Sequence, residues 1–257
     1  MKLLVKLGGT LLDGDASRAA IAAQVAAVRP RAPEMVLVHG GGRQMTRFLA
    51  AQGVESRFVN GLRVTTGEVI DAVLKIFTGT VNRGLVASLV AAGVPAVGLS
   101  GIDANLVEAE QLDPKLGAVG KPVRTNARLL ETLVAAGFLP VVACVAGGRD
   151  GAIYNVNADQ MAVSCAAGYK AERIVFLTDV EGVRDGSGVI RELTPARARR
   201  LIRDGIATGG MQAKLEAAID ALSRGVREVA IAPGAAPRVL ERLLDGDRLG
   251  TRIVEAP

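Results

Sequence analysis

The chain has 257 residues, of which 49% are hydrophobic, and its formal net charge is +5. This length and composition can fill the core of one large domain or of two lobes. Tryptophan is absent, tyrosine and phenylalanine are rare and no dense basic run is present, which argues against a stacking surface for nucleic acid. No uninterrupted run of about 20 apolar residues predicts a membrane span. No export signal precedes the first apolar run, so we expect a cytoplasmic protein that binds no membrane.

Apolar strand-like runs alternate along the chain with alanine-rich helical patterns. The predicted strands cover residues 3–7, 35–38, 96–99, 140–145, 174–178 and 229–232. The predicted helices cover residues 18–28, 43–51, 69–92, 128–136, 158–168 and 215–223. Near-continuous apolar strands separated by helices are typical of a parallel sheet covered on both faces. We therefore expect an α/β fold that binds its ligands where the carboxyl ends of the strands meet.

Other segments are interpreted by their composition. The polar stretch 105–123, with Pro114 and several glycines, predicts a β-hairpin or an irregular excursion. A lobe boundary is expected near residues 168–171, where a new strand-and-loop unit begins. Arg197–Arg203 is the densest basic cluster, and its helical pattern favours a solvated helix face. Cys144 and Cys165 lie among apolar residues without metal-ligand spacing, so we expect buried, reduced thiols.

Three glycine-rich turns lie beside basic residues or strand ends. Lys6 ends the first apolar run and is followed by Gly8-Gly9, the second apolar run leads into Gly40-Gly41-Gly42, and Gly209-Gly210 precedes Lys214. Bare N–H groups in such turns can approach a phosphate closely while an ammonium group offsets its charge. The glycines could instead only permit tight turns. Neither a Walker A loop nor the dinucleotide fingerprint is present. Together the turns indicate a site for phosphoryl transfer.

The stretch Asn155-Val156-Asn157-Ala158-Asp159 places three polar side chains in five residues. If its first part is extended, Asn155 and Asn157 point to the same side. Either Asn157 or Asp159 could cap the helix that follows. An acid at this position could also hold the ammonium groups of Lys6 and Lys214 in place.

Three further positions each allow two interpretations. Arg63 could grip a carboxylate with two parallel hydrogen bonds or form a surface salt bridge. The turn 178–182 follows a buried strand, and could contact a nucleotide or be a plain turn. His39 is the only histidine, and a structural role is favoured over that of a general base.

Five motifs occur in order over almost the whole chain: Lys6-x-Gly8-Gly9, His39-Gly40-Gly41-Gly42, Gly61-Leu62-Arg63-Val64-Thr65, Asn155-Val156-Asn157-Ala158-Asp159 and Gly209-Gly210-Met211-x-x-Lys214. Together they resemble the amino acid kinase family, and within it the kinases of N-acetyl-L-glutamate. The resemblance implies a three-layer α/β/α sandwich with a mainly parallel central sheet. It also implies an N-terminal lobe, residues 1–170, for the amino-acid substrate and dimerisation, and a C-terminal lobe, residues 171–257, for ATP.

The activity implied by the resemblance is transfer of the ATP γ-phosphoryl group to the side-chain carboxylate of N-acetyl-L-glutamate, a step of arginine biosynthesis. The implied catalytic residues are Lys6, Lys214 and Asp159. The implied substrate-binding residues are Gly41, Gly42, Arg63, Asn155 and Asn157. The implied phosphate-binding residues are Gly8, Gly9 and Gly40. The implied ATP-binding residues are Asp179, Val180, Glu181, Gly182, Val183, Arg184, Ile206, Ala207, Thr208, Gly210 and Met211. No protein metal site is implied, because Mg²⁺ is bound with the nucleotide.

Two departures from the family pattern matter. The chain starts at its first strand, without the additional N-terminal helix of arginine-inhibited hexameric relatives, so a homodimer insensitive to arginine is expected. Ile102 stands where many relatives carry lysine. Kinases of lysine-type biosynthesis, which act on a substrate attached to an acidic carrier protein, often have an apolar residue there. They are the alternative, although Gly61-Leu62-Arg63-Val64-Thr65 is closer to the free-acetylglutamate enzymes. A non-catalytic sensor of amino acids or nucleotides is a second alternative, which would tolerate loss of the catalytic residues.

Overall fold

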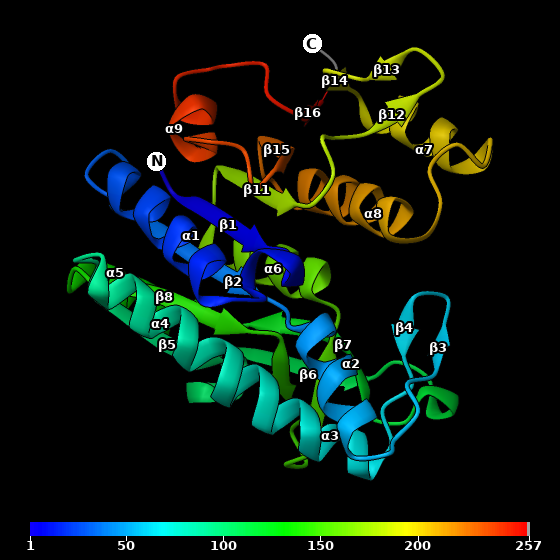
Figure 1. Cartoon of the computed structure of the whole chain (residues 1–257). Coiled ribbons are helices and arrows are strands. Elements are labelled where there is room, and N and C mark those ends of the chain that lie inside the picture. Colours follow the sequence, from blue (N-terminus) through cyan, green and yellow to red (C-terminus); the bar gives the residue numbers. More distant parts are fainter. Residues whose placement is uncertain (256–257) are drawn as a thin grey trace.

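The computed structural model describes residues 1–255, and its centre is a sheet of eight strands in the order β14-β16-β15-β11-β1-β2-β8-β5 (Figure 1). The neighbours from β15 to β5 are all parallel, whereas β16 runs antiparallel to β15 and β14 is parallel to β16. The strands are β1 (Leu3–Leu7), β2 (Met35–His39), β5 (Ala96–Ser100), β8 (Leu139–Ala143), β11 (Arg173–Thr178), β14 (Glu192–Leu193), β15 (Glu228–Pro233) and β16 (Thr251–Val254).

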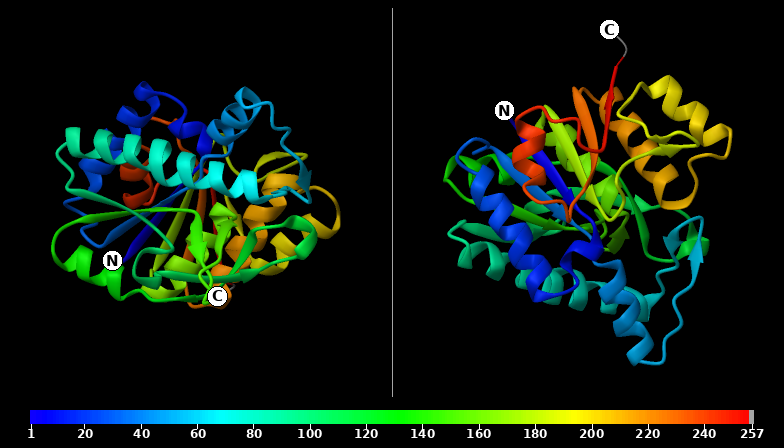
Figure 2. Two further views of the ribbon diagram at one scale, coloured as in Figure 1. Left: turned by 90° about the horizontal axis from the view of Figure 1, so that it is seen from below. Right: turned by 45° about the horizontal axis from the view of Figure 1, so that its top comes forward.

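Helices cover both faces of this sheet (Figure 2). Helices α1, α4 and α9 pack together on one face, and α6 packs with α8 on the other. The helices are α1 (Asp15–Val28), α2 (Gly42–Ala51), α3 (Gly67–Val73), α4 (Asn82–Ala91), α5 (Arg128–Ala135), α6 (Ala158–Tyr169), α7 (Pro195–Arg203), α8 (Gly209–Ser223) and α9 (Val239–Leu244). The predicted α/β/α sandwich with a mainly parallel sheet is therefore confirmed.

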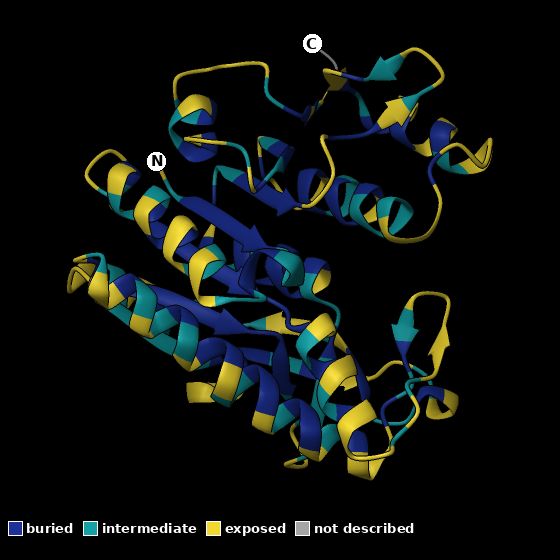
Figure 3. Cartoon of the chain, in the orientation of Figure 1, coloured by how far each residue is buried: buried dark blue, intermediate teal, exposed yellow. Residues whose placement is uncertain are grey.

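The central strands are buried because a helix layer covers each side (Figure 3). All five residues of β1 are buried, and Leu3, Leu4, Val5 and Leu7 have no exposed surface. Such strands read as continuous apolar runs, which is why the sequence predicts them well. Lys6 is the exception within β1, since it is a charged residue that is only 6% exposed.

A second, small sheet closes on itself and packs beside the carboxyl ends of the central strands. It consists of β6 (Val107–Gln111), β7 (Val119–Thr125), β9 (Val145–Gly147) and β10 (Ile153–Val156). Strands β6 and β7 form an antiparallel hairpin, which confirms the prediction for residues 105–123. Strand β9 was not predicted from the sequence, and before α6 the sequence pattern indicated only an extended chain. Strand β10 is important because it carries Asn155 beside β7.

Two predicted helices differ from the structure. The helix expected over 69–92 is a continuous helical stretch over 67–91 whose middle part, η2 (Leu74–Val81), is π-helical. Helix α8 begins at Gly209 rather than at Leu215, so Lys214 lies within the helix instead of before it. Two glycines usually weaken a helix, but here they form its open first turn.

Several short elements were not predicted. Strands β3 (Phe58–Val59) and β4 (Leu62–Arg63) form a hairpin around Asn60 and Gly61, both with positive φ. Asn-Gly is a strong hairpin signal that could have revealed this turn. The other short elements are η1 (Gly9–Leu12), η3 (Asp103–Asn105), η4 (Pro114–Leu116), β12 (Arg184–Asp185) and β13 (Gly188–Val189).

The helical stretch Gly67–Ala91 is long and apolar enough, by length and composition alone, to cross a membrane. Core helices of proteins in water pass the same test. Val73, Phe77, Leu85 and Leu89 of this stretch are buried in the hydrophobic core, so its apolar character has a structural explanation.

Gly250, which directly precedes β16, allows a test of the close packing at the central sheet. It has a φ of +78°, and a Cβ atom there would overlap the carbonyl oxygen of Ile231 in β15. We expect Gly250→Ala to destabilise the protein by about 3 kcal/mol, from the left-handed backbone and the steric overlap together. Gly67→Ala is the matched control, because that site is open and begins a helix. Thermal unfolding of both variants measures the difference in their stability. Equal melting temperatures would contradict the predicted strain and steric overlap at position 250.

Candidate active site

The first two glycine turns lie against each other at the carboxyl ends of β1 and β2. A Cβ atom at Gly9 would lie 3.4 Å from the backbone nitrogen of Gly42. The backbone N–H of Gly41 and that of Gly42 donate to no acceptor among residues 1–255. Gly42 begins α2 with Gly41 as its N-cap, so these free N–H groups and the helix dipole create a site for an anion.

The first turn differs in one respect from the implied roles. The N–H of Gly8 donates to the carbonyl oxygen of Leu177 at 2.9 Å, so this amide is engaged by β11 and is not free for a phosphate. The N–H groups of Gly9 and Thr10 have no acceptor in the described chain. Thr10 was not among the predicted site residues, although it completes the Gly8-Gly9-Thr10 turn. Gly40 has a packing role, since a Cβ there would lie 3.3 Å from Cβ of Ala158.

The structure brings together the three residues predicted to be catalytic. Lys6 Nζ lies 2.7 Å from Oδ1 of Asp159, and Lys214 Nζ lies 3.2 Å from Oδ2 of the same carboxylate. These side chains come from β1, from the first turn of α6 and from the second turn of α8. One carboxylate therefore holds two ammonium groups that are far apart in the sequence.

Burial by itself raises the pKa of Asp159. The charges of Lys6 and Lys214 and their hydrogen bonds together lower it by more than burial raises it, so the net pKa lies below its ordinary value. Asp159 is only 4% exposed and stays ionised at neutral pH. The cluster of two cations and one anion retains one positive charge. In a buried site such a charge attracts an anion much more strongly than it would in water.

The N-terminus of α6 is capped by Asn157 rather than by Asp159. Oδ1 of Asn157 accepts hydrogen bonds from the backbone nitrogens of Asp159 at 2.9 Å and Gln160 at 3.2 Å. The choice left open by the sequence is thereby settled. Because Asn157 satisfies the end of the helix, the carboxylate of Asp159 is available for the two lysines.

Two adjoining cavities surround this cluster. One, of about 510 Å³, is lined by Lys6, Asp159, Lys214 and the first turn of α8. The other, of about 160 Å³, lies between the Gly40–Gly42 turn, the β3–β4 hairpin and β10. Both are lined by Gly61, Leu62, Asn157 and Ala158. A small molecule in the smaller cavity would therefore lie beside a second ligand in the larger one.

Arg63 borders the smaller cavity and is buried without a carboxylate partner among the described residues. Its guanidinium donates to Oγ1 of Thr46 at 2.8 Å, to the carbonyl oxygen of Gly42 at 3.2 Å and to Oγ of Ser56, and it stacks on the ring of Phe58. Burial lowers the pKa of Arg63 from its very high ordinary value. The structure thus excludes a surface salt bridge and leaves a buried cation beside a cavity.

Asn155 extends the polar wall of the same cavity. Its Nδ2 donates to Oγ1 of Thr65 at 3.1 Å, and that hydroxyl donates to the carbonyl oxygen of Arg63 at 2.8 Å. The β3–β4 hairpin and β10 are therefore linked by side chains from two of the predicted motifs.

Comparison with known proteins gives the family. Residues 1–233 match the sequence model of the amino acid kinase family. The chain is 62% identical over 257 residues, covering all of both chains, to the acetylglutamate kinase of Solibacter usitatus (strain Ellin6076). The chain belongs to the amino acid kinase family.

Two solved structures are similar to this amino acid kinase over nearly its full length. The protein smu.665 from Streptococcus mutans UA159 has a TM-score of 0.86 and 27% identity, covering all of both chains. N-acetylglutamate synthase from Neisseria gonorrhoeae, complexed with coenzyme A and N-acetyl-glutamate, has a TM-score of 0.88 and 27% identity, covering 99% of this chain and 59% of that one. The family resemblance found in the sequence motifs is confirmed.

The predicted nucleotide-binding residues are not all equally placed to contact a ligand in this amino acid kinase. Gly210 lines the larger cavity in the first turn of α8. Val180 and Ile206 are apolar but 41% and 51% exposed. Val183 has a different role, because its side chain is fully buried, its N–H donates to Oγ1 of Thr251 and its carbonyl accepts from Ile190. It anchors the turn instead of facing a ligand.

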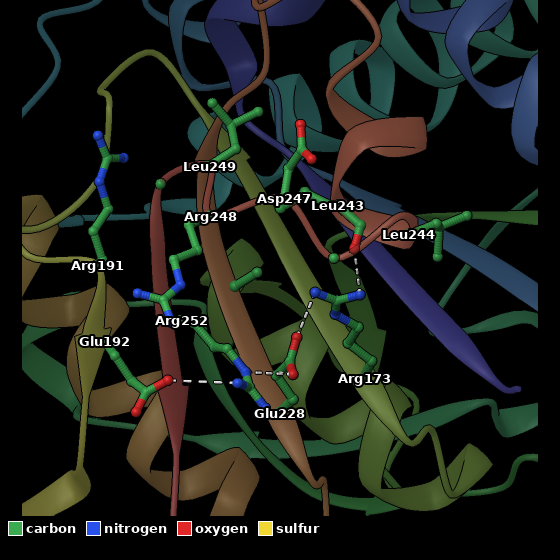
Figure 4. Close-up of a pocket in the computed structure, with 13 residues that line it drawn as sticks. Arg173, Arg191, Glu192, Glu228, Leu243, Leu244, Asp247, Arg248, Leu249 and Arg252 are labelled. Carbon is green, nitrogen blue, oxygen red and sulfur yellow. Dashed lines mark hydrogen bonds and ion pairs between the residues drawn. The ribbon is translucent and has the colours of Figure 1, made fainter.

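Another cavity lies at the opposite, amino-terminal ends of β11 and β15, and measures about 540 Å³ (Figure 4). Its charged side chains largely neutralise one another. Arg173 pairs with Glu228, and Arg252 pairs with Glu228 at 2.7 Å and with Glu192 at 3.4 Å. The glycine turns and the lysines lie at the other edge of the sheet, so this cavity is not part of the candidate active site.

His39 is fully buried below the second glycine turn, as its predicted structural role requires. Burial, with a smaller contribution from the charge of Arg83, lowers the pKa of His39 to about 4. The imidazole is therefore neutral at neutral pH, but it is too weakly basic and too deeply buried to act as a general base for chemistry in the cavities.

This shifted pKa predicts a pH-dependent stability. Between pH 6.5, the ordinary histidine pKa, and pH 4, the unfolded chain binds a proton that folded His39 does not bind. Stability from this group is complete above pH 6.5 and falls as the pH drops to 4, by about 3 kcal/mol in total. We expect His39→Asn to lose less stability over this range. Urea unfolding at pH 6.5 and 4.5 measures the difference, and identical losses in both proteins would contradict the burial of a neutral imidazole.

Proposed function

We propose that this amino acid kinase transfers the γ-phosphoryl group of ATP to the side-chain carboxylate of N-acetyl-L-glutamate, giving N-acetyl-L-glutamyl 5-phosphate in arginine biosynthesis. The observation that carries the proposal is the buried Lys6–Asp159–Lys214 cluster, which lies beside a cavity bordered by Arg63, a cation without a carboxylate partner among residues 1–255. The 62% identity to the acetylglutamate kinase of Solibacter usitatus supports the choice of acceptor.

The reaction needs no general base, because the attacking carboxylate is already ionised at neutral pH. It needs two anions held in line while their repulsion is neutralised. Lys6 and Lys214 supply positive charge beside the transferring phosphoryl group, and Asp159 holds both ammonium groups in position. The free N–H groups of Gly41 and Gly42 add donors that require no reorganisation.

The acceptor would occupy the smaller cavity. Arg63 would bind its α-carboxylate, and the side chains of Asn155 and Asn157 would contact neighbouring polar atoms. A volume of about 160 Å³ suits a small molecule. Arg63 already donates to neutral oxygens, so a carboxylate would give it a negative partner that no side chain in the described part of the protein supplies.

ATP would bind over the larger cavity at the N-terminus of α8. Gly209 and Gly210 leave this helix end open, since a Cβ atom at either would meet nothing within 4 Å, and its N–H groups suit phosphate oxygens. The exposed side chains of Val180 and Ile206 offer apolar contacts for the adenine base. In this arrangement residues 171–257 form the nucleotide lobe and residues 1–170 the acceptor lobe.

Mg²⁺ would enter with the nucleotide. Among residues 1–255, no group of three or more histidine, cysteine, aspartate or glutamate side chains is placed to hold a metal ion. Both oxygens of Asp159 already contact lysines. This donor set fits an ion that retains water and is bound chiefly by the substrate phosphates, where it neutralises their charge.

We further propose a cytoplasmic homodimer that assembles through the N-terminal lobe. Both cysteines are free and buried, which suits a reducing compartment. Val90 and Phe138, in the N-terminal lobe, are 56% and 40% exposed, and such apolar side chains are candidates for a subunit contact.

The activity is tested by ATP-dependent formation of an acyl phosphate, trapped with hydroxylamine, using N-acetyl-L-glutamate, glutamate and aspartate as acceptors. We expect turnover with N-acetyl-L-glutamate and much less with the free amino acids, which lack the acetyl group. Folded protein that binds ATP but is silent with all three would contradict the proposal. That outcome would favour a carrier-bound acceptor or a sensor.

Loss of either catalytic lysine should affect the chemical step. We expect Lys6→Ala and Lys214→Ala each to lower kcat by about 10²-fold or more, by analogy with removal of one oxyanion-hole donor. Lys121→Ala, on an exposed part of β7, is the control and should keep full activity. Steady-state kinetics compares the three, and an unchanged kcat in either active-site variant would remove that lysine from the mechanism.

Arg63 should contribute to acceptor binding instead. We expect Arg63→Lys to raise the KM for N-acetyl-L-glutamate by about 10-fold or more, because lysine cannot form the two parallel hydrogen bonds. The KM for ATP should remain nearly unchanged. A fall in kcat with an unchanged acceptor KM would contradict this role. Circular dichroism checks that the Arg63→Lys variant remains folded.

A further inference from the structure

The single histidine of the chain lies at the centre of a buried hydrogen-bond chain. Nδ1 of His39 lies 2.8 Å from the carbonyl oxygen of Gly40, and Nε2 lies 2.9 Å from Nδ2 of Asn82. Asn82 begins α4 and has no exposed surface. The chain therefore connects a helix on one face of the sheet with the glycine turn of the active site.

The partners of Asn82 determine which of its amide atoms faces the histidine. Its Nδ2 also donates to the carbonyl oxygen of Val141 at 3.0 Å, and its Oδ1 accepts from the guanidinium of Arg83 at 2.8 Å. A carbonyl can only accept and a guanidinium can only donate. Both contacts require the same amide orientation, so Nδ2 is the donor to His39.

This orientation fixes the tautomer of His39. Nε2 receives a hydrogen bond and must carry a lone pair, so the ring proton lies on Nδ1 and is donated to the carbonyl oxygen of Gly40. The pKa of His39, lowered to about 4 by burial, keeps Nε2 unprotonated at neutral pH. At neutral pH, Nδ1 therefore carries the proton that it donates to the carbonyl oxygen of Gly40.

The carbonyl of Gly40 and the N–H of Gly41 belong to one peptide group. The described chain has no cis peptide bond, and in a trans peptide these two groups point in opposite directions. Because the carbonyl is held against the buried imidazole, the N–H of Gly41 points away from it. Gly41 lines the smaller cavity, and its N–H has no acceptor in the described structure.

A run of three glycines would not hold this peptide by itself. Glycine has few steric restrictions on its backbone rotation, so the Gly40–Gly41 peptide could turn its carbonyl towards the cavity. A carbonyl oxygen there would repel the oxygens of the two reacting anions. The Gly40–Gly41 peptide needs a fixed partner, and His39 is the side chain that hydrogen-bonds to the carbonyl of Gly40.

We propose that His39 is a positioning residue, which acts with Asn82 to hold the Gly40–Gly41 peptide so that the N–H of Gly41 faces the oxygens of the acceptor carboxylate and the transferring phosphoryl group. This inference rests on the proposed function for the nature of the bound oxygens. The hydrogen-bond chain itself can be tested without any substrate.

The first experiment observes the tautomer. Protein labelled with ring-¹⁵N histidine and purified without a polyhistidine tag gives a single pair of ring-nitrogen signals, because His39 is the only histidine. We expect a protonated Nδ1 and an unprotonated Nε2 at pH 7. A protonated Nε2, or rapid averaging of the two nitrogens, would overturn the inference whether or not the protein is a kinase.

The second experiment uses two variants of His39 that replace one ring nitrogen each. The amide of asparagine can take the place of Nδ1 and donate to Gly40, whereas the longer glutamine places its amide near the position of Nε2 and loses that bond. We expect His39→Asn to keep kcat within about 3-fold and His39→Gln to lower it by about 10- to 100-fold, somewhat less than full loss of an oxyanion donor. The KM for ATP should change little in either.

The outcomes separate the two proposals. Wild-type protein that shows no turnover with N-acetyl-L-glutamate removes the proposed function, and the ¹⁵N result still tests the hydrogen-bond chain. Active wild-type protein with equal kcat in both variants overturns the role of His39. Should His39→Gln fail to fold, Asn82→Leu replaces it, because leucine cannot donate to Nε2. An unchanged kcat in Asn82→Leu would overturn the inference, and a reduced kcat with an unchanged ATP KM would support it.

Discussion

The carboxylate of Asp159 holds two lysines from distant parts of the chain beside each other. Lys6 comes from the first strand and Lys214 from a helix near the C-terminus, and their ammonium groups would repel each other without an anion between them. Asp159 contacts both, at 2.7 and 3.2 Å. Such a buried cluster stabilises the fold little, because desolvation offsets the attraction. Its value lies in holding a net positive charge where two negatively charged substrates can meet.

Other parts of the fold position the residues around this cluster. Asn157 caps α6, so Asp159 does not have to. The parallel strands β1 and β2 place their glycine turns side by side, and β10 brings Asn155 next to the hairpin that carries Arg63. Each contact uses a different part of the fold, so the site depends on the arrangement of the whole sheet.

The sequence predicts the parts of this arrangement that depend on composition and on local spacing. Buried parallel strands are continuous apolar runs, and the five motifs identify the family. The engaged N–H of Gly8 could not be predicted, because it depends on where β1 pairs with β11. The early start of α8 was missed because Gly209-Gly210 normally indicates a helix end. The partners of Arg63 and His39 come from distant segments, which spacing along one chain cannot reveal.

The π-helical segment η2 has a consequence for the length of the chain in this region. A π-turn amounts to one extra residue within an α-helix, and each residue of an α-helix turns the next by about 100°. Phe77 of this segment packs below Gly41, and Asn82 directly after it reaches His39. With regular α-helical geometry the same five-residue spacing would turn Asn82 well away from the side of Phe77, whereas the wider π-turn, closed by the bond from the Asn82 N–H to the Phe77 carbonyl, keeps the two on nearly one side. The number of residues between these two side chains is therefore fixed as firmly as their identities.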